Sequence, residues 1–335
     1  MNMNSESELI ETVKRIIEKR GRASVEKARE EILDSPYDGG IVSSAVKYFA
    51  RVTLRQGLPV FPALISLSCE AVGGKTEKAT SIGAALTLIA GAADIHDDII
   101  DQSQVKYSKK TVFGKFGGNV ALLAGDALLI EGSMLLHREC ESLPEEQRKE
   151  IVGLISEALF EISDAEVKES RLMKNLDAIP QEYFEIIKLK AVVPEVHCKI
   201  GAILGNADRA GVEALGNYGR TFGVASLVRD EFIDLHEYSE LQNRIKNECL
   251  PLPMLHALQN LVIKNEVKAY IESSNPTRKE LNRIMKLVLG SEQVRLLRRD
   301  LDLTVSDGIE RLAAVGNNTS IKELESLLRV TTTIM

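Results

Sequence analysis

Two short acidic motifs carry the side chains best suited to chemistry in this sequence. They read Asp97-Asp98-Ile99-Ile100-Asp101 and Asp230-Glu231-Phe232-Ile233-Asp234, and about 130 residues separate them. On an α-helix, residues i and i+4 lie on one face, so each motif presents its carboxylates together. Mg²⁺ takes oxygen ligands and commonly combines one or two carboxylates with substrate phosphates. The spacing therefore predicts a cluster of divalent cations shared by two helices, with a diphosphate held between them.

Long helices are expected to position these motifs. Proline is absent from residues 63–143 and 195–250, so nothing interrupts helical structure around either motif. Two segments have the sequence of a capping box at a helix start, Ser142–Glu145 and Thr277–Glu280. Gly290 followed by Ser291 predicts that one helix ends where the next begins. These signals favour an all-α fold.

The composition supports the same fold class. Of the 335 residues, 44% are hydrophobic but only 4% are aromatic, and tryptophan is absent. A core built mainly from alanine, leucine, isoleucine and valine is typical of helical proteins. No linker divides the sequence, so we expect a single helical domain at residues 36–335 and a peripheral helical segment at residues 1–35.

Charge and cysteine content exclude several classes of protein. The formal net charge of −7 argues against nucleic acid as a partner. The four cysteines are too scattered for a zinc site or a disulfide scaffold, which favours a reducing, cytoplasmic location. The N-terminus lacks an apolar signal segment, and the weakly polar run at residues 82–93 is too short to span a bilayer. We therefore expect neither a secretory signal nor a transmembrane segment.

The landmarks around the motifs resemble the trans-isoprenyl (polyprenyl) diphosphate synthase family. Its first DDxxD motif is followed by a loop and an LAGDxLL helix, which match Asp97–Asp101 and Leu123–Leu129. Its second acidic motif matches Asp230–Asp234, with Glu231 in place of aspartate. The resemblance covers roughly residues 40–300 and implies the isoprenoid synthase fold, in which antiparallel helices surround an apolar cavity, usually in a homodimer.

In this family, three Mg²⁺ ions assist ionisation of an allylic prenyl diphosphate, and isopentenyl diphosphate then attacks the allylic cation. The resemblance implies catalytic roles for Asp97, Asp98, Asp101 and Lys190. It implies metal ligands, direct or through water, at Asp97, Asp98, Asp101, Asp230, Glu231 and Asp234. The diphosphate-binding candidates are Lys190, Lys106 and Lys246.

Several family cations are missing here. The GKRxRP stretch that helps to bind isopentenyl diphosphate corresponds to Gly57–Pro62, the usual histidine to Ala90, and the RRG sequence to Lys106–Ser108. Each lost charge-assisted hydrogen bond is worth roughly 1.5–3 kcal/mol. The site for the second substrate is therefore eroded.

Four residues before the first motif are expected to line a product cavity: Leu86, Ile89, Ala92 and Ala93. A bulky residue four or five positions before DDxxD caps short products in the family, and alanine at both positions leaves room for a C20-like or longer chain. Close helix packing by small residues is the alternative. Two neighbours have structural interpretations. His96 is expected to pack beside the motif, and the ring of Pro194 is expected to kink the helix at Lys190 and turn that lysine toward a ligand.

Three functions fit this pattern. The first is prenyl transfer to isopentenyl diphosphate, giving a polyprenyl diphosphate. The second is a terpene cyclase or lyase that ionises the allylic diphosphate without condensation. The third is a non-catalytic subunit that pairs with an active paralogue.

Overall fold

The computed structural model describes residues 3–37, 39–106, 108–273 and 276–333; the side chains of residues 3–5, 239 and 246 lie outside this description. The chain divides into two compact units. Unit 1 comprises Met1–Leu154, His197–Leu215 and Val315–Leu324, and unit 2 comprises Ile155–Val196, Gly216–Ala314 and Glu325–Met335. Helices α7, α9, α10 and α16 each contribute residues to both units.

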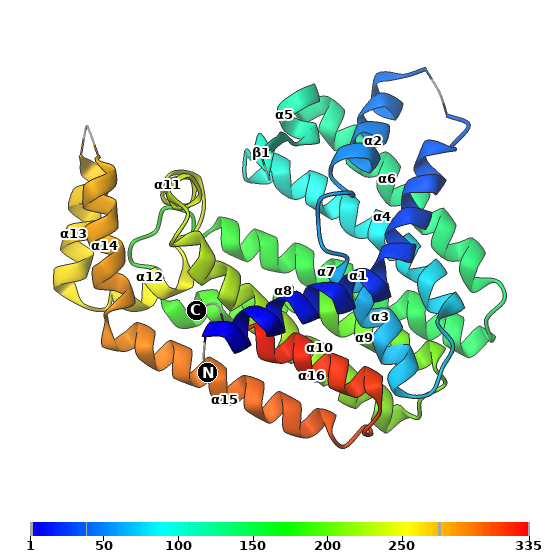
Figure 1. The fold of residues 1–335 in the computed structure, drawn as a ribbon. Coiled ribbons are helices and arrows are strands. Elements are labelled where there is room, and N and C mark those ends of the chain that lie inside the picture. Colours follow the sequence, from blue (N-terminus) through cyan, green and yellow to red (C-terminus); the bar gives the residue numbers. More distant parts are fainter. Residues whose placement is uncertain (1–2, 38, 107, 274–275, 334–335) are drawn as a thin grey trace. The chain divides into compact units, whose positions relative to one another are not determined.

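Two long helices, α4 and α6, pack together in unit 1 (Figure 1). Both are apolar. Its elements are α1 (Met3–Leu33), α2 (Ile41–Val52), α3 (Val60–Ala71), α4 (Thr76–Ile100), β1 (Val105–Lys106), β2 (Lys109–Lys110), α5 (Val112–Phe116), α6 (Gly118–Cys140) and the start of α7 (Glu145–Ser170). Helices α4 and α6 pack closely, since a Cβ on Gly132 of α6 would lie 3.0 Å from the Ile89 backbone nitrogen. The middle of α4 is thereby packed directly against α6.

The first helix belongs to the core of unit 1. Its side chains at Val13, Ile17, Val25 and Ile32 are buried, and α1 packs against α3 and α4. Residues 1–35, expected to be a peripheral segment, thus supply part of this hydrophobic core. The division of the structure does not coincide with the boundary expected at residue 35.

Unit 2 contains the remaining helices. These are α8 (Pro180–Lys190), α9 (Val192–Leu204), α10 (Arg209–Asp234), α11 (Tyr238–Asn247), α12 (Leu252–Ala257), α13 (Leu261–Glu272), α14 (Arg278–Leu289), α15 (Glu292–Leu312) and α16 (Thr319–Val330), of which α9, α10 and α16 also reach into unit 1. Two predicted helix signals are confirmed. Thr277 and Glu280 form a capping box, and Ser291 caps α15 directly after α14 ends at Gly290. The helix is interrupted where Pro194 predicts a kink, because α8 ends at Lys190 and α9 begins at Val192.

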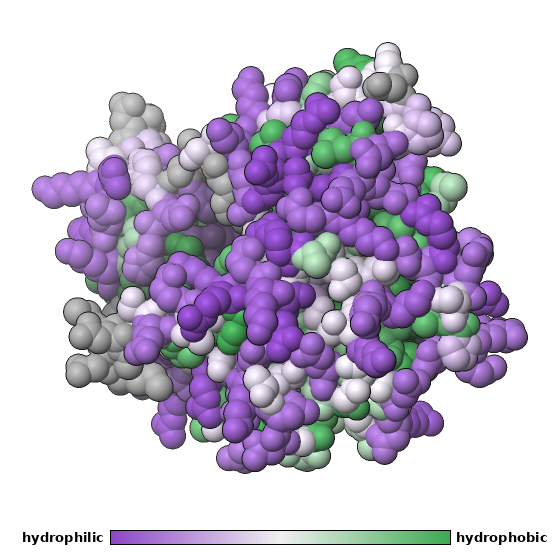
Figure 2. Space-filling model, turned by 45° about the vertical axis from the view of Figure 1, so that its right-hand side comes forward, coloured by the Kyte–Doolittle hydropathy of each residue, from purple (hydrophilic) through white to green (hydrophobic). Residues whose placement is uncertain are grey.

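Across the described residues, the only strands are the two-residue pair β1 and β2, so the predicted all-α class is confirmed. The face shown in Figure 2 is mostly hydrophilic, with small scattered hydrophobic groups. By length and composition, α4 and α6 could each cross a membrane. The core helices of soluble proteins pass the same test, and the most apolar window of α4 is 61% buried within the protein. The expected absence of a transmembrane segment therefore stays a prediction.

Candidate functional site

The first acidic motif lies at the C-terminal end of α4, in unit 1. Asp97 and Asp98 occupy the last helical turn, and Asp101 is the C-cap, whose N–H donates to the Asp97 carbonyl oxygen at 2.9 Å. A helix C-terminus carries partial negative charge from its exposed carbonyl groups. Three carboxylates at this position repel one another and the helix end, so the local structure needs a cation.

Lys106 supplies that cation in the structure. It lies on β1, where the hairpin returns the chain toward α4, and its Nζ is 2.9 Å from Asp94 Oδ1 and 2.8 Å from Asp98 Oδ1. The same Nζ is 3.9 Å from Asp97 Oδ2. The predicted diphosphate-binding residue therefore already holds the first motif. The sequence analysis missed Asp94, although its i, i+4 spacing to Asp98 was a usable signal.

Burial and charge act in opposite directions at this cluster. Burial raises the pKa of the Asp98 carboxyl more than the Lys106 ammonium lowers it, so the pKa is about 6. Burial alone would lower the pKa of Lys106, but Asp94 and Asp98 raise it above its ordinary value. Lys106 is therefore charged at neutral pH, and its side chain remains 34% exposed, within reach of a ligand.

The LAGD segment packs beside this motif. His96 Nε2 lies 3.3 Å from Asp126 Oδ1, across the contact between α4 and α6. A Cβ on Gly125 would lie only 2.4 Å from His96 Nε2, so the glycine of LAGD makes room for the imidazole. This arrangement agrees with the interpretation of His96 as a packing neighbour of the acidic motif.

The residues expected to line a product cavity lie along α4. Leu86, Ile89 and Ala92 are buried, whereas Ala93 is partly exposed. Ile89 packs over Gly132 of α6, which favours the close-packing alternative at that position. For Ala92 and Ala93, room for a long chain stays a prediction.

The segment that corresponds to the missing cation stretch, residues 57–62 at the start of α3, is apolar in the structure as well. Leu58 and Phe61 are 44% and 37% exposed, and the Phe61 ring packs against His197 with 5.2 Å between ring centroids. Ala90 lies within α4 and offers no polar side chain. Tyr107, the centre of the eroded RRG position, lies outside the described residues.

The second acidic motif ends α10, in unit 2. Asp230 is 55% exposed and pairs with Arg229 at 2.7 Å, while the Glu231 side chain is only 10% exposed. Asp234 Oδ2 accepts from Arg244 Nη1 at 2.8 Å, and burial raises the pKa of Asp234 to about 7. Arg244, on α11, was missed by the sequence analysis because no local spacing links it to the motif.

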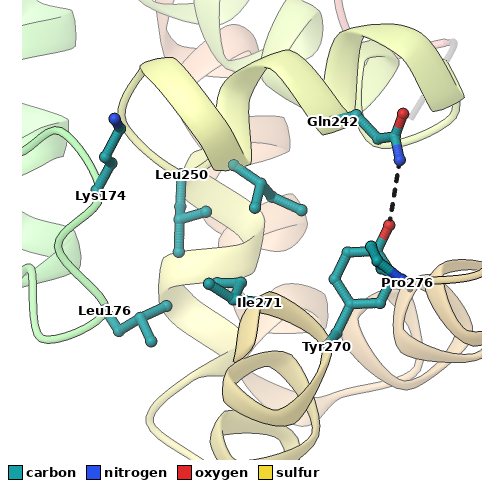
Figure 3. Close-up of a pocket in the computed structure, with 8 residues that line it drawn as sticks. Lys174, Leu176, Gln242, Leu250, Tyr270, Ile271 and Pro276 are labelled. Atoms are coloured by element: carbon teal, nitrogen blue, oxygen red, sulfur yellow. Dashed lines mark hydrogen bonds between the residues drawn. The ribbon is translucent and has the colours of Figure 1, made fainter. Parts of the chain in front are cut away.

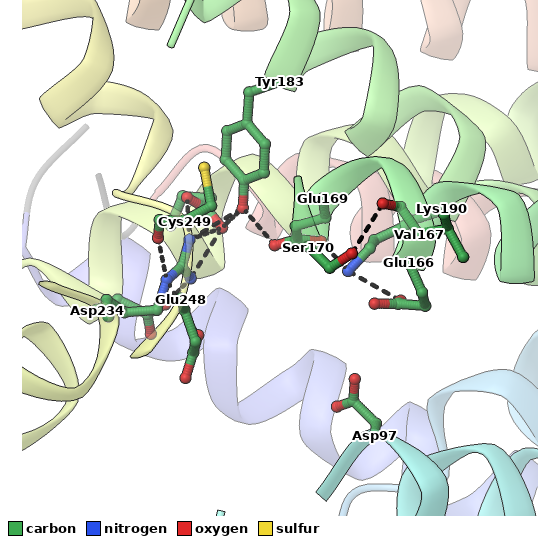
Figure 4. Close-up of polar contacts among 12 residues, drawn as sticks. Asp97, Glu166, Val167, Glu169, Ser170, Tyr183, Lys190, Asp234, Glu248 and Cys249 are labelled. Carbon is green, nitrogen blue, oxygen red and sulfur yellow. Dashed lines mark hydrogen bonds and ion pairs between the residues drawn. The ribbon is translucent and has the colours of Figure 1, made fainter. Parts of the chain in front are cut away.

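Lys190 is also paired with protein carboxylates. Its Nζ lies 2.9 Å from Glu166 Oε1 and forms a second ion pair with Glu169, both on α7 (Figure 4). Burial lowers the pKa of Lys190, but these two carboxylates raise it above its ordinary value. The sequence analysis missed both glutamates. Lys246 lies in α11, but its side chain is outside the described part of the chain.

The acidic side chains of the two motifs differ in how well they could hold a metal. Among the described side chains, no three acidic, histidine or cysteine residues converge closely enough to hold a metal by themselves. The carboxylates of Asp97, Asp98 and Asp101 at a helix C-terminus suit Mg²⁺ when a phosphate completes the ligand set. Glu231 does not suit a metal, because Arg244 donates to its Oε1 and the Leu252 N–H donates to its Oε2. That the two motifs share one ligand stays a prediction.

A separate cavity of about 250 Å³ lies in unit 2 (Figure 3). Most of its lining is apolar, and Gln242 Nε2 lies 3.5 Å from Tyr270 Oη at one side. The residues that line it are Lys174, Leu176, Gln242, Ile245, Leu250, Tyr270, Ile271 and Pro276. None of them was predicted as a site residue.

Comparisons with known proteins agree with the landmarks. The polyprenyl synthetase family matches residues 43–288. The chain is 29% identical over 221 residues to the short chain isoprenyl diphosphate synthase of Methanothermobacter thermautotrophicus, covering 66% of each chain. It is 25% identical over 276 residues to heptaprenyl diphosphate synthase component 2 of Bacillus subtilis, covering 81% of this chain and 75% of that one. This chain thus spans about two thirds of the length of the first relative.

The fold is shared with solved structures. The geranylgeranyl pyrophosphate synthetase of Pyrococcus horikoshii superposes with a TM-score of 0.85, covering 97% of this chain and 99% of that one at 22% identity. The expected isoprenoid synthase fold is therefore confirmed.

Proposed function

Because this chain belongs to the polyprenyl synthetase family, we propose that it uses Mg²⁺ to ionise an allylic prenyl diphosphate and transfers the prenyl group to isopentenyl diphosphate. One observation carries the ionisation step: the carboxylates at the end of α4 are held by Lys106, which is exposed enough to move to a diphosphate. The names of relatives, which include a short chain isoprenyl diphosphate synthase and synthases of geranylgeranyl and heptaprenyl diphosphate, support prenyl transfer.

In this proposal, aspartates bind the metal and lysines bind the diphosphate during ionisation. Asp97 and Asp101 would hold metal, with Asp98 beside them, and the metal ions supply Lewis-acid stabilisation to the leaving diphosphate. Lys106 and Lys190 would exchange their carboxylate partners for diphosphate oxygens. When the C–O bond breaks, its electron pair leaves with the diphosphate, and apolar surroundings keep water from the allylic cation.

The pocket expected for isopentenyl diphosphate lacks its cations. Leu58, Phe61 and Ala90 occupy positions where family members carry cations, and none can hold a second diphosphate. This observation favours a second candidate, a cyclase or lyase that ionises the same substrate without isopentenyl diphosphate. The relative named component 2 of a heptaprenyl synthase suggests a third, a subunit of a heteromer.

One assay separates the three candidates. Purified protein is incubated with Mg²⁺ and geranyl, farnesyl or geranylgeranyl diphosphate, with and without isopentenyl diphosphate, and products and released diphosphate are measured. A longer prenyl diphosphate only in the complete mixture supports condensation. A hydrocarbon or alcohol without isopentenyl diphosphate supports the second candidate, and activity only with an added paralogue supports the third.

Matched variants test the metal assignment. Asp97→Asn and Asp101→Asn should each lower diphosphate release by at least 100-fold while the melting temperature stays close to that of the wild type. Asp302→Asn on α15, far from the motif in sequence, is the control. Release unchanged in both motif variants would refute the assignment.

The product length follows from α4 in this proposal. Ala92 and Ala93 stand at positions where a bulky side chain stops chain growth in the family, so we expect a C20-like or longer product. Ala93→Phe should shorten the main product, as measured by chromatography after removal of the diphosphate. An unchanged product would favour the packing alternative.

A second copy of the chain is the partner that we propose. Helix α6 exposes large apolar side chains on one side, at Leu122, Leu123, Ile130 and Met134, each at least 50% exposed. Burying this stripe against the same stripe of a second copy would form a symmetric contact. Leu123→Glu together with Met134→Glu should convert a dimer to a monomer in sedimentation velocity, and a wild-type monomer at the same concentration would refute the homodimer.

We also propose a cytoplasmic location. All four cysteines of the sequence are free and buried in the structure, which suits a reducing compartment. Fractionation of the source cells with an antibody to the chain would test it.

A further inference from the structure

Arg244 occupies the centre of the second acidic motif. It is 6% exposed, and its guanidinium Nη1 donates to Glu231 Oε1 at 3.1 Å and to Asp234 Oδ2 at 2.8 Å. Its Nη2 donates to both Glu231 oxygens at 3.1 Å and to Tyr183 Oη at 2.9 Å. Its Nε donates to the Cys249 carbonyl oxygen at 2.9 Å. Every nitrogen of the guanidinium is thus committed to a protein oxygen.

Both carboxylate oxygens of Glu231 accept hydrogen bonds from protein donors. Its Oε1 accepts from the Tyr183 hydroxyl at 2.9 Å in addition to Arg244, and its Oε2 accepts from the Leu252 N–H at 2.7 Å. Mg²⁺ requires oxygen ligands at about 2.0–2.1 Å in near-octahedral geometry. To reach Glu231, a metal would have to displace a buried guanidinium, a buried hydroxyl or a backbone N–H. The motif position that is glutamate here is a structural anchor for α11 and α12.

Lys106 at the first motif shows the contrast. It is a single ammonium on a two-residue strand and is 34% exposed, so it can turn away from Asp98 toward solvent or a ligand. Arg244 has a side chain that is 7% exposed and a planar fork with a partner for each nitrogen. Its departure would leave buried carboxylates without a counter-charge. The first motif therefore holds an exchangeable cation, and the second holds a fixed one.

The remaining carboxylate of the second motif is isolated from that network. Asp230 is 55% exposed and pairs with its neighbour Arg229. A single solvated carboxylate that already has a cation beside it is a weak ligand for a divalent metal.

We propose that Arg244 is a built-in cation that takes the place of a divalent metal at the second acidic motif, so that divalent cations bind this chain through the first motif alone. This inference rests on the proposed function, in which the first motif binds metal with a diphosphate. The charge at the second motif is then permanent and independent of the free Mg²⁺ concentration.

The test counts bound metal on the full chain. Mn²⁺ binding is measured by electron paramagnetic resonance and calorimetry, with and without inorganic diphosphate as the probe. The variants are Asp97→Asn with Asp101→Asn, Asp230→Asn with Asp234→Asn, and Arg244→Gln.

The second-motif pair should keep the wild-type number of bound Mn²⁺ ions, and the first-motif pair should lose them all. Arg244→Gln should gain binding that Asp234→Asn then removes. If Arg244→Gln does not fold, the second-motif pair still decides, because Asp→Asn keeps the size of the side chain and one of its two acceptor oxygens, and Glu231 stays as a partner of Arg244. Loss of Mn²⁺ in the second-motif pair would overturn the proposal. Absence of Mn²⁺ from the wild type under all conditions would instead contradict the proposed function.

Discussion

Replacing Lys106 with glutamine should move two binding affinities in opposite directions. In the unliganded protein, the Lys106 ammonium lies 2.8 Å from Asp98 and 2.9 Å from Asp94, so an incoming metal must compete with it. With a diphosphate present, the same ammonium is expected to donate to a phosphate oxygen. The substitution therefore removes a competitor of the metal and a donor to the diphosphate at once.

The magnitude follows from the exposure of this side chain. A charge-assisted hydrogen bond contributes roughly 1.5–3 kcal/mol, and we reduce this to about 1 kcal/mol because a third of Lys106 is exposed to screening solvent. At about 1.4 kcal/mol per tenfold change, each affinity should shift by about fivefold. Lys106→Gln should bind Mn²⁺ alone about fivefold more tightly and bind inorganic diphosphate, in saturating Mg²⁺, about fivefold less tightly.

Calorimetry measures both affinities on the same preparations. Lys109→Gln is the matched control, because Lys109 is the strand partner of Lys106 in the hairpin and its side chain is exposed. It should change neither affinity by more than about twofold. If Lys106→Gln weakened both affinities, or left both unchanged, the exchange of Lys106 between carboxylate and diphosphate would be refuted.

Three further predictions concern packing and charge. Gly125→Ala would bring a Cβ to within 2.4 Å of His96 Nε2, so the free energy of unfolding should fall by about 1–3 kcal/mol. Gly153→Ala is the control in thermal denaturation, because no atom lies within 4 Å of the added Cβ and the protein should not be destabilised. Tyr183→Phe removes a buried hydroxyl from the Arg244 network and should cost about 1–3 kcal/mol of stability without changing Mn²⁺ binding, measured by denaturation and calorimetry. Burial raises the pKa of Asp98 from 3.8 to about 6, so the contribution of this carboxyl to stability is present below about pH 4 and is lost as the pH rises through 6. With a chelator present, the melting temperature of the wild type should therefore fall relative to that of Asp98→Asn between pH 4 and 7. Parallel pH profiles of the two proteins would contradict this assignment.

Local patterns in the sequence were sufficient for the fold class and for the first motif. The i, i+4 spacing of Asp97 and Asp101 depends only on helix geometry, and the capping box at Thr277 depends on residues three positions apart. The break after Lys190 follows from the ring of Pro194, whose effect reaches only one helical turn. Such features involve neighbours in the chain, so no tertiary information was needed.

Contacts between distant segments could not be found in this way. Lys190 pairs with Glu166 and Glu169 from the preceding helix, and Lys106 reaches back 12 residues to Asp94. The partner of each cation depends on how its helix or hairpin packs, and the sequence separation carries no periodic signal. The diphosphate role predicted for both lysines therefore depends on whether these pairs exchange.

The sequence by itself determined that two carboxylate motifs stand on helices, each with acidic side chains at positions i and i+4. Only the tertiary structure decided which cation each motif holds. The first motif pairs with Lys106, whose partly exposed side chain can exchange a carboxylate for a phosphate partner. At the second, packing buries Arg244 against Glu231 and Asp234, and a buried guanidinium cannot leave without stranding their charges. The two motifs are alike in sequence, and burial is the physical reason that they differ.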